Sequence, residues 1–166
     1  MAGVDLFWPA DDGVVPNNPS LPLVVYRGAL ACGPGAEHAI CQQFEANGWS
    51  NGWVNGIYSF HHYHATAHEV LGLASGRAHV QFGGPAGPIV EVGAGDGVLI
   101  PAGVGHCRIS ASADLVVVGA YPGGCEWDLV RATPEAYAAS LALIAAVPPP
   151  ARDPVTGVRQ PVWHRQ

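Results

Sequence analysis

The sequence predicts one all-β domain, built as a small antiparallel barrel or sandwich. Its 166 residues are 49% hydrophobic, which is enough for one sizeable core. Only 12% are charged, whereas 22 are glycine and 15 are proline. That composition is typical of short segments joined by tight turns. Between residues 57 and 118, short β-prone runs alternate with such turns, as in small barrels and sandwiches.

Residues 1–34 are expected to form an N-terminal arm that ends in an edge strand. Prolines recur between residues 9 and 22, which excludes a helix there. The β-prone run at residues 23–27 follows directly, and the prolines ahead of it favour an edge position. An exposed edge is commonly covered by pairing across a two-fold axis, so the sequence predicts a homodimer.

Residues 35–122 are expected to form the barrel, with a short helix over residues 36–47. Ile40 and Phe44 lie on one face of that helix, and an Asn-Gly dipeptide supplies a left-handed stop. Trp49 and Trp53 follow, and the Asn-Gly dipeptides at residues 51–52 and 55–56 favour tight turns beside them. We expect both tryptophans to plug one end of the barrel, with a place in a pocket wall as the alternative. The expected strands cover residues 57–64, 69–73, 77–82, 89–92, 98–100 and 115–120.

Residues 123–166 are expected to form a C-terminal helix and a tail, packed on the same domain. Thr133 is an N-cap and Pro134 suits the first helical position. One apolar stripe is expected from Tyr137, Leu141 and Ile144. The tail from residue 151 has little periodicity, so we expect it along the surface or on a partner subunit.

Charge and segment composition exclude several classes of function. The formal net charge is −6, and the seven Lys and Arg residues are scattered singly, so no basic stripe is available for phosphates. Nucleic-acid binding and anionic membrane surfaces are therefore disfavoured. The N-terminus lacks a signal-peptide pattern and no apolar run has membrane-spanning length. A soluble, cytoplasmic protein is expected.

Two patterned segments carry potential metal ligands. His62 and His64 are two apart on an expected strand and therefore project from the same face. Glu69 has the wrong parity for an unbroken strand, so residues 65–67 must bend to bring its carboxylate inward. His106 closes a loop with proline and glycines, which could deliver an imidazole from another strand pair. Three nitrogens and one oxygen would then meet.

These segments resemble the two conserved motifs of the cupins. The first, G(X)5HXH(X)3–4E(X)6G, is matched by Gly56, His62, His64, Glu69 and Gly76. The second, G(X)5PXG(X)2H(X)3N, is matched by Gly95, Pro101, Gly103 and His106, with Ser110 in place of Asn. The flanks also resemble single-domain bacterial cupins of an uncharacterised subfamily. The resemblance implies a jelly-roll antiparallel β-barrel and a metal held by His62, His64, Glu69 and His106.

The donor set indicates one divalent transition metal. Imidazole and carboxylate without thiolate suit Fe, Mn, Ni, Cu or Zn, and the sequence does not choose among them. Four protein ligands leave two octahedral positions open for water, substrate or dioxygen. His68 is the rival to Glu69, because a differently phased bend would turn its imidazole inward instead.

The expected pocket is apolar and suits a small organic molecule. Tyr58 and Phe60 share the ligand face, and Val98 and Ile100 add aliphatic surface. We interpret the chain as a metal-dependent enzyme, with a dioxygenase-type oxidoreductase slightly favoured. A sugar or keto-acid isomerase or epimerase is an alternative, for which the sequence offers His61, His68 or Tyr58 as bases. A non-catalytic module that binds a small molecule or a metal is the third reading.

Overall fold

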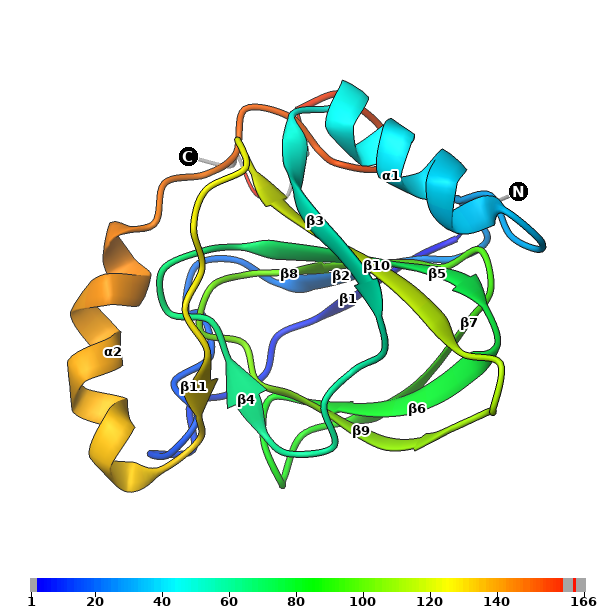
Figure 1. The fold of residues 1–166 in the computed structure, drawn as a ribbon. Coiled ribbons are helices and arrows are strands. Elements are labelled where there is room, and N and C mark those ends of the chain that lie inside the picture. The colour runs from blue at the N-terminus through cyan, green and yellow to red at the C-terminus, as the bar shows by residue number, and fades with distance from the viewer. Residues whose placement is uncertain (1–2, 160–162, 164–166) are drawn as a thin grey trace.

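The computed structural model describes residues 3–159 and residue 163, which form two antiparallel sheets and two helices (Figure 1). The strands are β1 (Val4–Phe7), β2 (Leu23–Tyr26), β3 (Trp49–Asn55), β4 (His62–Tyr63), β5 (Glu69–Ser75), β6 (Arg77–Phe82), β7 (Ile89–Gly93), β8 (Gly97–Ile100), β9 (His106–Ala111), β10 (Val116–Pro122) and β11 (Val130–Arg131). The helices are α1 (Ala36–Ala46) and α2 (Pro134–Ala146). Within these residues, neither helix combines the length and the apolar character that crossing a membrane requires.

The two sheets make a jelly-roll sandwich. The larger sheet has the strand order β1-β2-β8-β5-β10-β3, and the smaller one has the order β11-β4-β9-β6-β7. The predicted all-β jelly roll with an N-terminal and a C-terminal helix is confirmed. The strands do not close into a hydrogen-bonded barrel in the described part of the chain, because β3 ends one sheet while β11 and β7 end the other.

The main core lies between the sheets. Strand β6 alternates as expected, with Ala78, Val80 and Phe82 buried against residues of β5 and β8. A second cluster lies on the outer face of the larger sheet, where Ile40 and Phe44 of α1 pack against that sheet (Figure 1). The strands β4, β5 and β9, which carry the side chains of the candidate site, belong to these two packed sheets.

The N-terminal arm folds back on its own domain. Strand β1 pairs antiparallel with β2, and β2 pairs on its other side with β8. The expectation of an edge strand at residues 23–27 is therefore wrong. The prolines precede β2 instead of interrupting it, so its backbone can pair on both sides. Because β1 covers the edge that suggested pairing between subunits, the homodimer stays a prediction without that support.

The segment after α1 is a strand, although its Asn-Gly dipeptides suggested turns. Trp49 is buried, but in the cluster on the outer face of the larger sheet and not at one end of the barrel as expected, and its Nε1 donates to the Arg152 carbonyl at 2.9 Å. Asn51 has a φ of 56° inside β3, where the register with β10 shifts. The dipeptide therefore makes a bulge, which increases the twist of the edge strand.

Helix α2 begins as predicted, but the prediction of one apolar stripe along it is wrong. The Thr133 side chain accepts a hydrogen bond from the Ala136 amide at 3.2 Å. Only Ile144 of the expected stripe is buried, whereas Leu141 is 43% exposed. Ser140 is buried instead, because its hydroxyl bonds that of Tyr63 at 2.8 Å.

Part of the C-terminal tail packs on the domain. Val155 belongs to the outer core, and the Pro154 carbonyl accepts a hydrogen bond of 2.7 Å from Asn47. The rest of the tail prediction, for residues 160–162 and 164–166, falls outside the described residues.

Candidate metal centre

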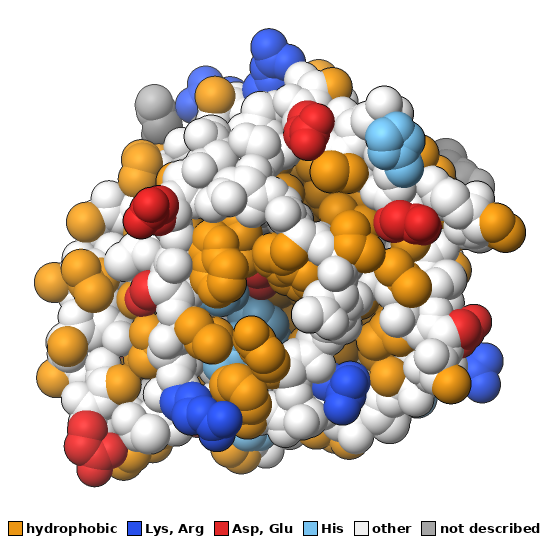
Figure 2. All heavy atoms as spheres, in the orientation of Figure 1, with side chains coloured by type: hydrophobic (Ala, Val, Ile, Leu, Met, Phe, Trp, Pro, Cys, Tyr) orange, Lys and Arg blue, Asp and Glu red, His pale blue; other side chains and the backbone are white. Residues whose placement is uncertain are grey.

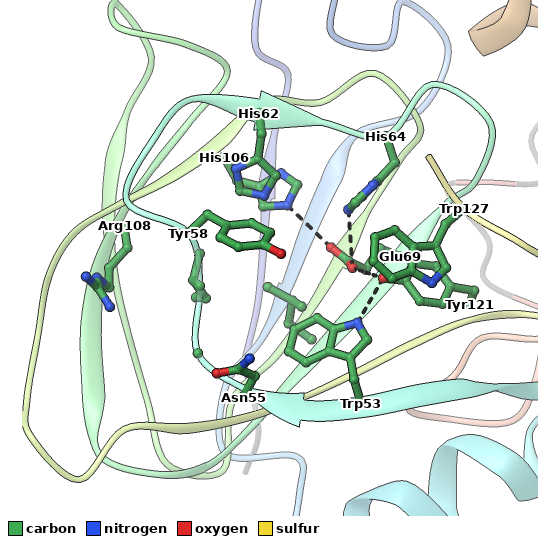
Figure 3. Close-up of a pocket in the computed structure, with 13 residues that line it drawn as sticks. Trp53, Asn55, Tyr58, His62, His64, Glu69, His106, Arg108, Tyr121 and Trp127 are labelled. Carbon is green, nitrogen blue, oxygen red and sulfur yellow. Dashed lines mark hydrogen bonds and ion pairs between the residues drawn. The ribbon is translucent and has the colours of Figure 1, made fainter. Parts of the chain in front are cut away.

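The structure brings His62, His64, Glu69 and His106 together at the open end of the sandwich (Figure 3). His62 on β4 pairs directly with His106 on β9, and their ring centroids are 4.0 Å apart. His64, His62 and His106 are buried, and each offers a ring nitrogen within 4.8 Å of the others. Glu69 begins β5 and is only 2% exposed.

Each of the three imidazoles is held in the same tautomer. Nδ1 of His62 donates to the Phe60 carbonyl at 2.9 Å, and Nδ1 of His106 donates to the Val104 carbonyl at 3.1 Å. Nδ1 of His64 donates to the Asp128 carbonyl. A carbonyl can only accept, so the proton must be on Nδ1 and the lone pair of Nε2 is left for a ligand. Metal-binding histidines are commonly oriented in this way.

Glu69 completes the cluster with its carboxylate. Oε2 lies 3.3 Å from Nε2 of His64, and Oε1 lies 3.3 Å from Nε2 of His106. Adjacent donors around an octahedral ion with bonds of about 2.1 Å are about 3 Å apart. The donor types suit a divalent transition metal, and these two distances are close to that spacing.

Burial and mutual charge set the protonation of the cluster. Burial lowers the pKa of His62 to about 3, with a further contribution from His106. Burial opposes ionisation of Glu69, but the adjacent His64 and His106 hold its pKa well below the usual range. Burial also opposes protonation of His64, yet Glu69 raises the pKa of that imidazole overall. A proton at His64 therefore competes with a metal for the same lone pair.

The bend between His64 and Glu69 is fixed by Asp128. Its Oδ1 accepts hydrogen bonds from the Ala65 amide at 2.9 Å, from the Thr66 amide at 3.0 Å and from the Thr66 hydroxyl at 2.9 Å. Three donors on one oxygen hold this turn, and the backbone carbonyl of the same residue orients His64. The predicted bend is therefore present, and its anchor lies far away in the sequence.

His68 faces away from the cluster. Its Nε2 donates to the Pro148 carbonyl at 3.1 Å, and its Nδ1 accepts from the Ala102 amide at 2.9 Å. Its ring also packs edge-on against Trp163, with centroids 4.8 Å apart. In the structure Glu69 therefore faces the histidines, and His68 does not.

A cavity of about 330 Å³ leads from the surface to this cluster. Figure 2 shows it as a hollow with histidine and acidic side chains at the bottom and hydrophobic side chains around it. The lining is formed by Trp53, Asn55, Gly56, Ile57, Tyr58, His62, His64, Glu69, Leu71, His106, Arg108, Tyr121 and Trp127. Trp127 stacks on Tyr121 with centroids 5.2 Å apart and forms part of the aromatic wall.

Of the four predicted pocket residues, Tyr58 alone is among the described residues that line this cavity. Phe60 stacks on Tyr58 with ring centroids 4.9 Å apart, and Cζ of Arg131 lies 3.8 Å from the centroid of the Phe60 ring. Val98 and Ile100 are buried in the core between the sheets. The apolar character of this segment predicts a pocket position for both residues, but β8 lies inside its sheet, between β2 and β5.

Several residues of the site carry no clear signal in the sequence. Trp127 and Asp128 lie in a segment without periodicity, and the adjacent β11 has only two residues. Tyr121 lies in β10, one residue beyond the strand predicted at residues 115–120, and its contact with Glu69 depends on the pairing of β10 with β5. Strand parity could have indicated Arg108, since it is two residues beyond His106.

Comparison with known proteins shows one close relative in sequence. No family model matches the chain. The uncharacterized protein YjlB of Bacillus subtilis (strain 168) is 43% identical over 156 residues, which cover 94% of this chain and 92% of that protein.

The similar solved structures are more distant. Acireductone dioxygenase from Bacillus anthracis, with a cadmium ion in its active centre, aligns with 20% identity and a TM-score of 0.38, over 51% of this chain and 57% of that one. The DMSP lyase DddQ from Ruegeria pomeroyi aligns with 20% identity and a TM-score of 0.37, over 71% of this chain and 46% of that one. The chain thus spans about half the length of these two solved chains.

The sequence and the structure therefore agree on the class of protein. Both motif segments lie in a two-sheet jelly roll, and their four ligand-type side chains meet in one cluster. The chain belongs to the same family as the uncharacterized protein YjlB of Bacillus subtilis, and its two motif segments and its jelly-roll sandwich resemble those of the cupins.

Proposed function

We propose that the chain is a metal-dependent enzyme that acts on a small organic molecule. His62, His64, Glu69 and His106 would hold one divalent transition metal, Fe, Mn, Ni, Cu or Zn. The observation that carries this proposal is the common tautomer of the three histidines, which directs three Nε2 lone pairs and a buried carboxylate to one place.

The open cavity supports catalysis over storage of a metal. Structural metal sites are usually closed by protein ligands, whereas catalytic sites keep a position open. Here the cluster forms the bottom of a cavity, and Tyr58 in its lining is 49% exposed. A small molecule can therefore reach the cluster from solvent.

The lining favours a dioxygenase-type oxidoreductase. A redox-active metal in such a site supplies coordination of a chelating substrate and electron transfer to dioxygen. The chain would contribute a largely apolar wall, with Trp53, Leu71 and Trp127, that limits access of water. Tyr121 stays protonated, because burial and Glu69 raise its pKa far above the usual value, and it serves as a donor to Glu69.

An isomerase or epimerase is less well supported, because it needs a base that moves a proton. Of the three candidate bases, His61 and His68 are not among the described residues that line the cavity. Tyr58 does line it, and this alternative would therefore depend on Tyr58.

The test begins with protein purified without contact with an affinity metal. We expect about one transition metal per chain and, after anaerobic loading with Fe(II), oxygen uptake with members of a panel of diols, thiols and keto acids. The His64→Gln variant should lose the metal, whereas His79→Gln should keep it, since His79 lies on exposed β6 surface. Full Fe(II) loading without uptake on any compound would contradict the dioxygenase proposal, and turnover with Zn(II) in the absence of oxygen would support the isomerase.

A further inference from the structure

Arg108 is the one cationic side chain, apart from histidines, among the described residues that line the cavity. It lies on β9 two residues after His106, so both side chains project from the same face of the strand. Arg108 also lines a shallow groove that adjoins the cavity and shares Asn55 and Gly56 with it. Figure 3 shows Arg108 across the cavity from Trp127 and Tyr121. Arg108 therefore lies at the mouth, and Glu69 at the inner end.

The guanidinium of Arg108 has no protein partner among the described residues. Its backbone amide donates to the Tyr58 carbonyl at 2.9 Å, but no ion pair or side-chain hydrogen bond involves the guanidinium. Arg27 differs, because it pairs with Asp5 at 3.0 Å and with Asp96 at 3.2 Å. Arg131 is placed over the Phe60 ring. A half-buried guanidinium without a partner is suited to an anion from outside the protein.

The surfaces between the two ends of the cavity are aromatic and uncharged. Tyr58 and Trp53 lie there, and both present flat rings to the cavity (Figure 3). The volume of about 330 Å³ is at the lower end of ligand pockets, which span about 300–1,000 Å³. A flat molecule of modest size fits such walls.

We propose that the cavity binds a small flat organic carboxylate, whose carboxylate is held by Arg108. One guanidinium neutralises one negative charge and matches the two oxygens of a carboxylate with parallel N–H donors. The role of Arg108 does not depend on the proposed function. Only the placement of the opposite end of the ligand, at the metal centre, rests on it. The charge at the mouth thus selects the ligand class, and the histidine-glutamate cluster selects the chemistry.

The test compares carboxylates with their neutral amides in metal-free protein. Acetate and acetamide, benzoate and benzamide, and cinnamate and cinnamamide form matched pairs, and phenyl phosphate is the phosphate arm. Binding is measured by quenching of tryptophan fluorescence, since Trp53 and Trp127 line the cavity, and by calorimetry. We expect an aromatic carboxylate to bind about tenfold or more tightly than its amide.

Variants assign that preference to one side chain. Arg108→Gln should abolish the preference without changing the affinity for the amide, and Arg108→Lys should keep part of it. Arg77→Gln is the matched control, because Arg77 is an exposed arginine on β6. Circular dichroism should show that all three variants are folded.

Three results would overturn the proposal. They are a panel in which no carboxylate is preferred over its amide, a preference that survives Arg108→Gln, and tighter Arg108-dependent binding of phenyl phosphate, which would indicate phosphate esters. Metal binding is measured separately on the same proteins. A chain that takes no metal but binds carboxylates through Arg108 would refute the proposed enzyme and leave this inference standing.

Discussion

The hydroxyl of Tyr121 donates a hydrogen bond of 2.7 Å to Oε2 of Glu69, and it accepts one of 2.9 Å from Nε1 of Trp53. These contacts connect β3, β10 and β5, which are neighbours in the larger sheet. Glu69 is therefore oriented from two sides, by the histidines of the cluster and by an aromatic pair from the sheet. Trp53 also contacts Gly119, where a Cβ would lie 2.2 Å from the Trp53 ring. A larger residue at Gly119 would displace this pair.

Replacement of Tyr121 by Phe removes the donor to Glu69 and keeps the ring. Groups that orient metal ligands typically contribute about 10- to 100-fold in affinity, so Tyr121→Phe should weaken binding of Zn(II) or Co(II) by that factor. The measurement is competition with a chelator of known affinity. Tyr137→Phe is the control, since its hydroxyl bonds Asp11 at the surface. Unchanged affinity in Tyr121→Phe would show that the histidines alone position Glu69.

Asp128 gives a second prediction, for the bend between His64 and Glu69. Asp128→Ala leaves two backbone amides and the Thr66 hydroxyl without their acceptor. We expect a loss of metal affinity of about 10-fold or more and an altered Co(II) absorption spectrum, because the turn no longer fixes the position of His64 relative to Glu69.

Asp128→Asn separates this positioning role from the negative charge. The amide oxygen can still accept hydrogen bonds, so this variant should recover most of the affinity and a spectrum like that of the original protein. Asp114→Ala is the control, because residue 114 is exposed in a turn. If Asp128→Ala and Asp114→Ala gave the same spectrum, the bend would hold without its anchor.

These two predictions also show what the sequence could and could not reveal about the site. Strand parity predicts that His62 and His64 lie together, and the bend before Glu69 follows from its wrong parity. Both signals are local, and the structure brings these residues to His106. The expected strand at residues 57–64 is nevertheless mostly wrong, because only His62–Tyr63 of it forms a strand. Asp128 acts on His64 from a segment that no local pattern connects to it, and that contact arises only when β11 pairs with β4. Tertiary pairing of a two-residue strand leaves no periodic trace in the sequence.

The fold shows the same limit. The alternation of polar and apolar residues predicted β6 correctly, because one face of this strand is exposed and the other is buried. Strand β8 is buried on both faces, so its apolar run could not show whether Val98 and Ile100 lie in the core or in the cavity. The prolines before β2 are compatible with an edge strand or an inner strand, and the choice depends on whether β1 pairs with it.

Gly72 gives a prediction for stability. A Cβ at this position of β5 would lie 2.7 Å from Cγ2 of Ile40 and 3.0 Å from Cζ of Phe44. Helix α1 packs at this point because the strand has no side chain there. Gly72→Ala should lower the free energy of unfolding by about 1–3 kcal/mol, as overpacking usually does. Urea denaturation measures the change.

Gly56→Ala is the matched control for that variant, since a Cβ there meets no atom within 4 Å. It should change the free energy of unfolding by less than about 0.5 kcal/mol. Equal stability of Gly72→Ala and the original protein would mean that α1 can shift outward at little cost.

His68 gives a prediction for the dependence of stability on pH. Burial lowers its pKa from 6.5 to about 4, although the hydrogen bond to Pro148 opposes the shift. The unfolded chain therefore binds a proton at His68 between about pH 6.5 and pH 4, where the folded chain does not. The free energy of unfolding is thus highest above pH 6.5 and falls as the pH drops to about 4, by about 3 kcal/mol for this group.

The measurement is urea denaturation of metal-free protein between about pH 7.5 and pH 4.5. His62 contributes in the same direction because burial lowers its pKa as well. His68→Gln should therefore reduce the loss of stability on acidification without removing it. His79→Gln should leave that loss unchanged, since the His79 side chain is 47% exposed. An acid profile of His68→Gln parallel to that of the original protein would show that His68 does not titrate in this range, because only a group whose pKa differs between the folded and unfolded states makes stability depend on pH.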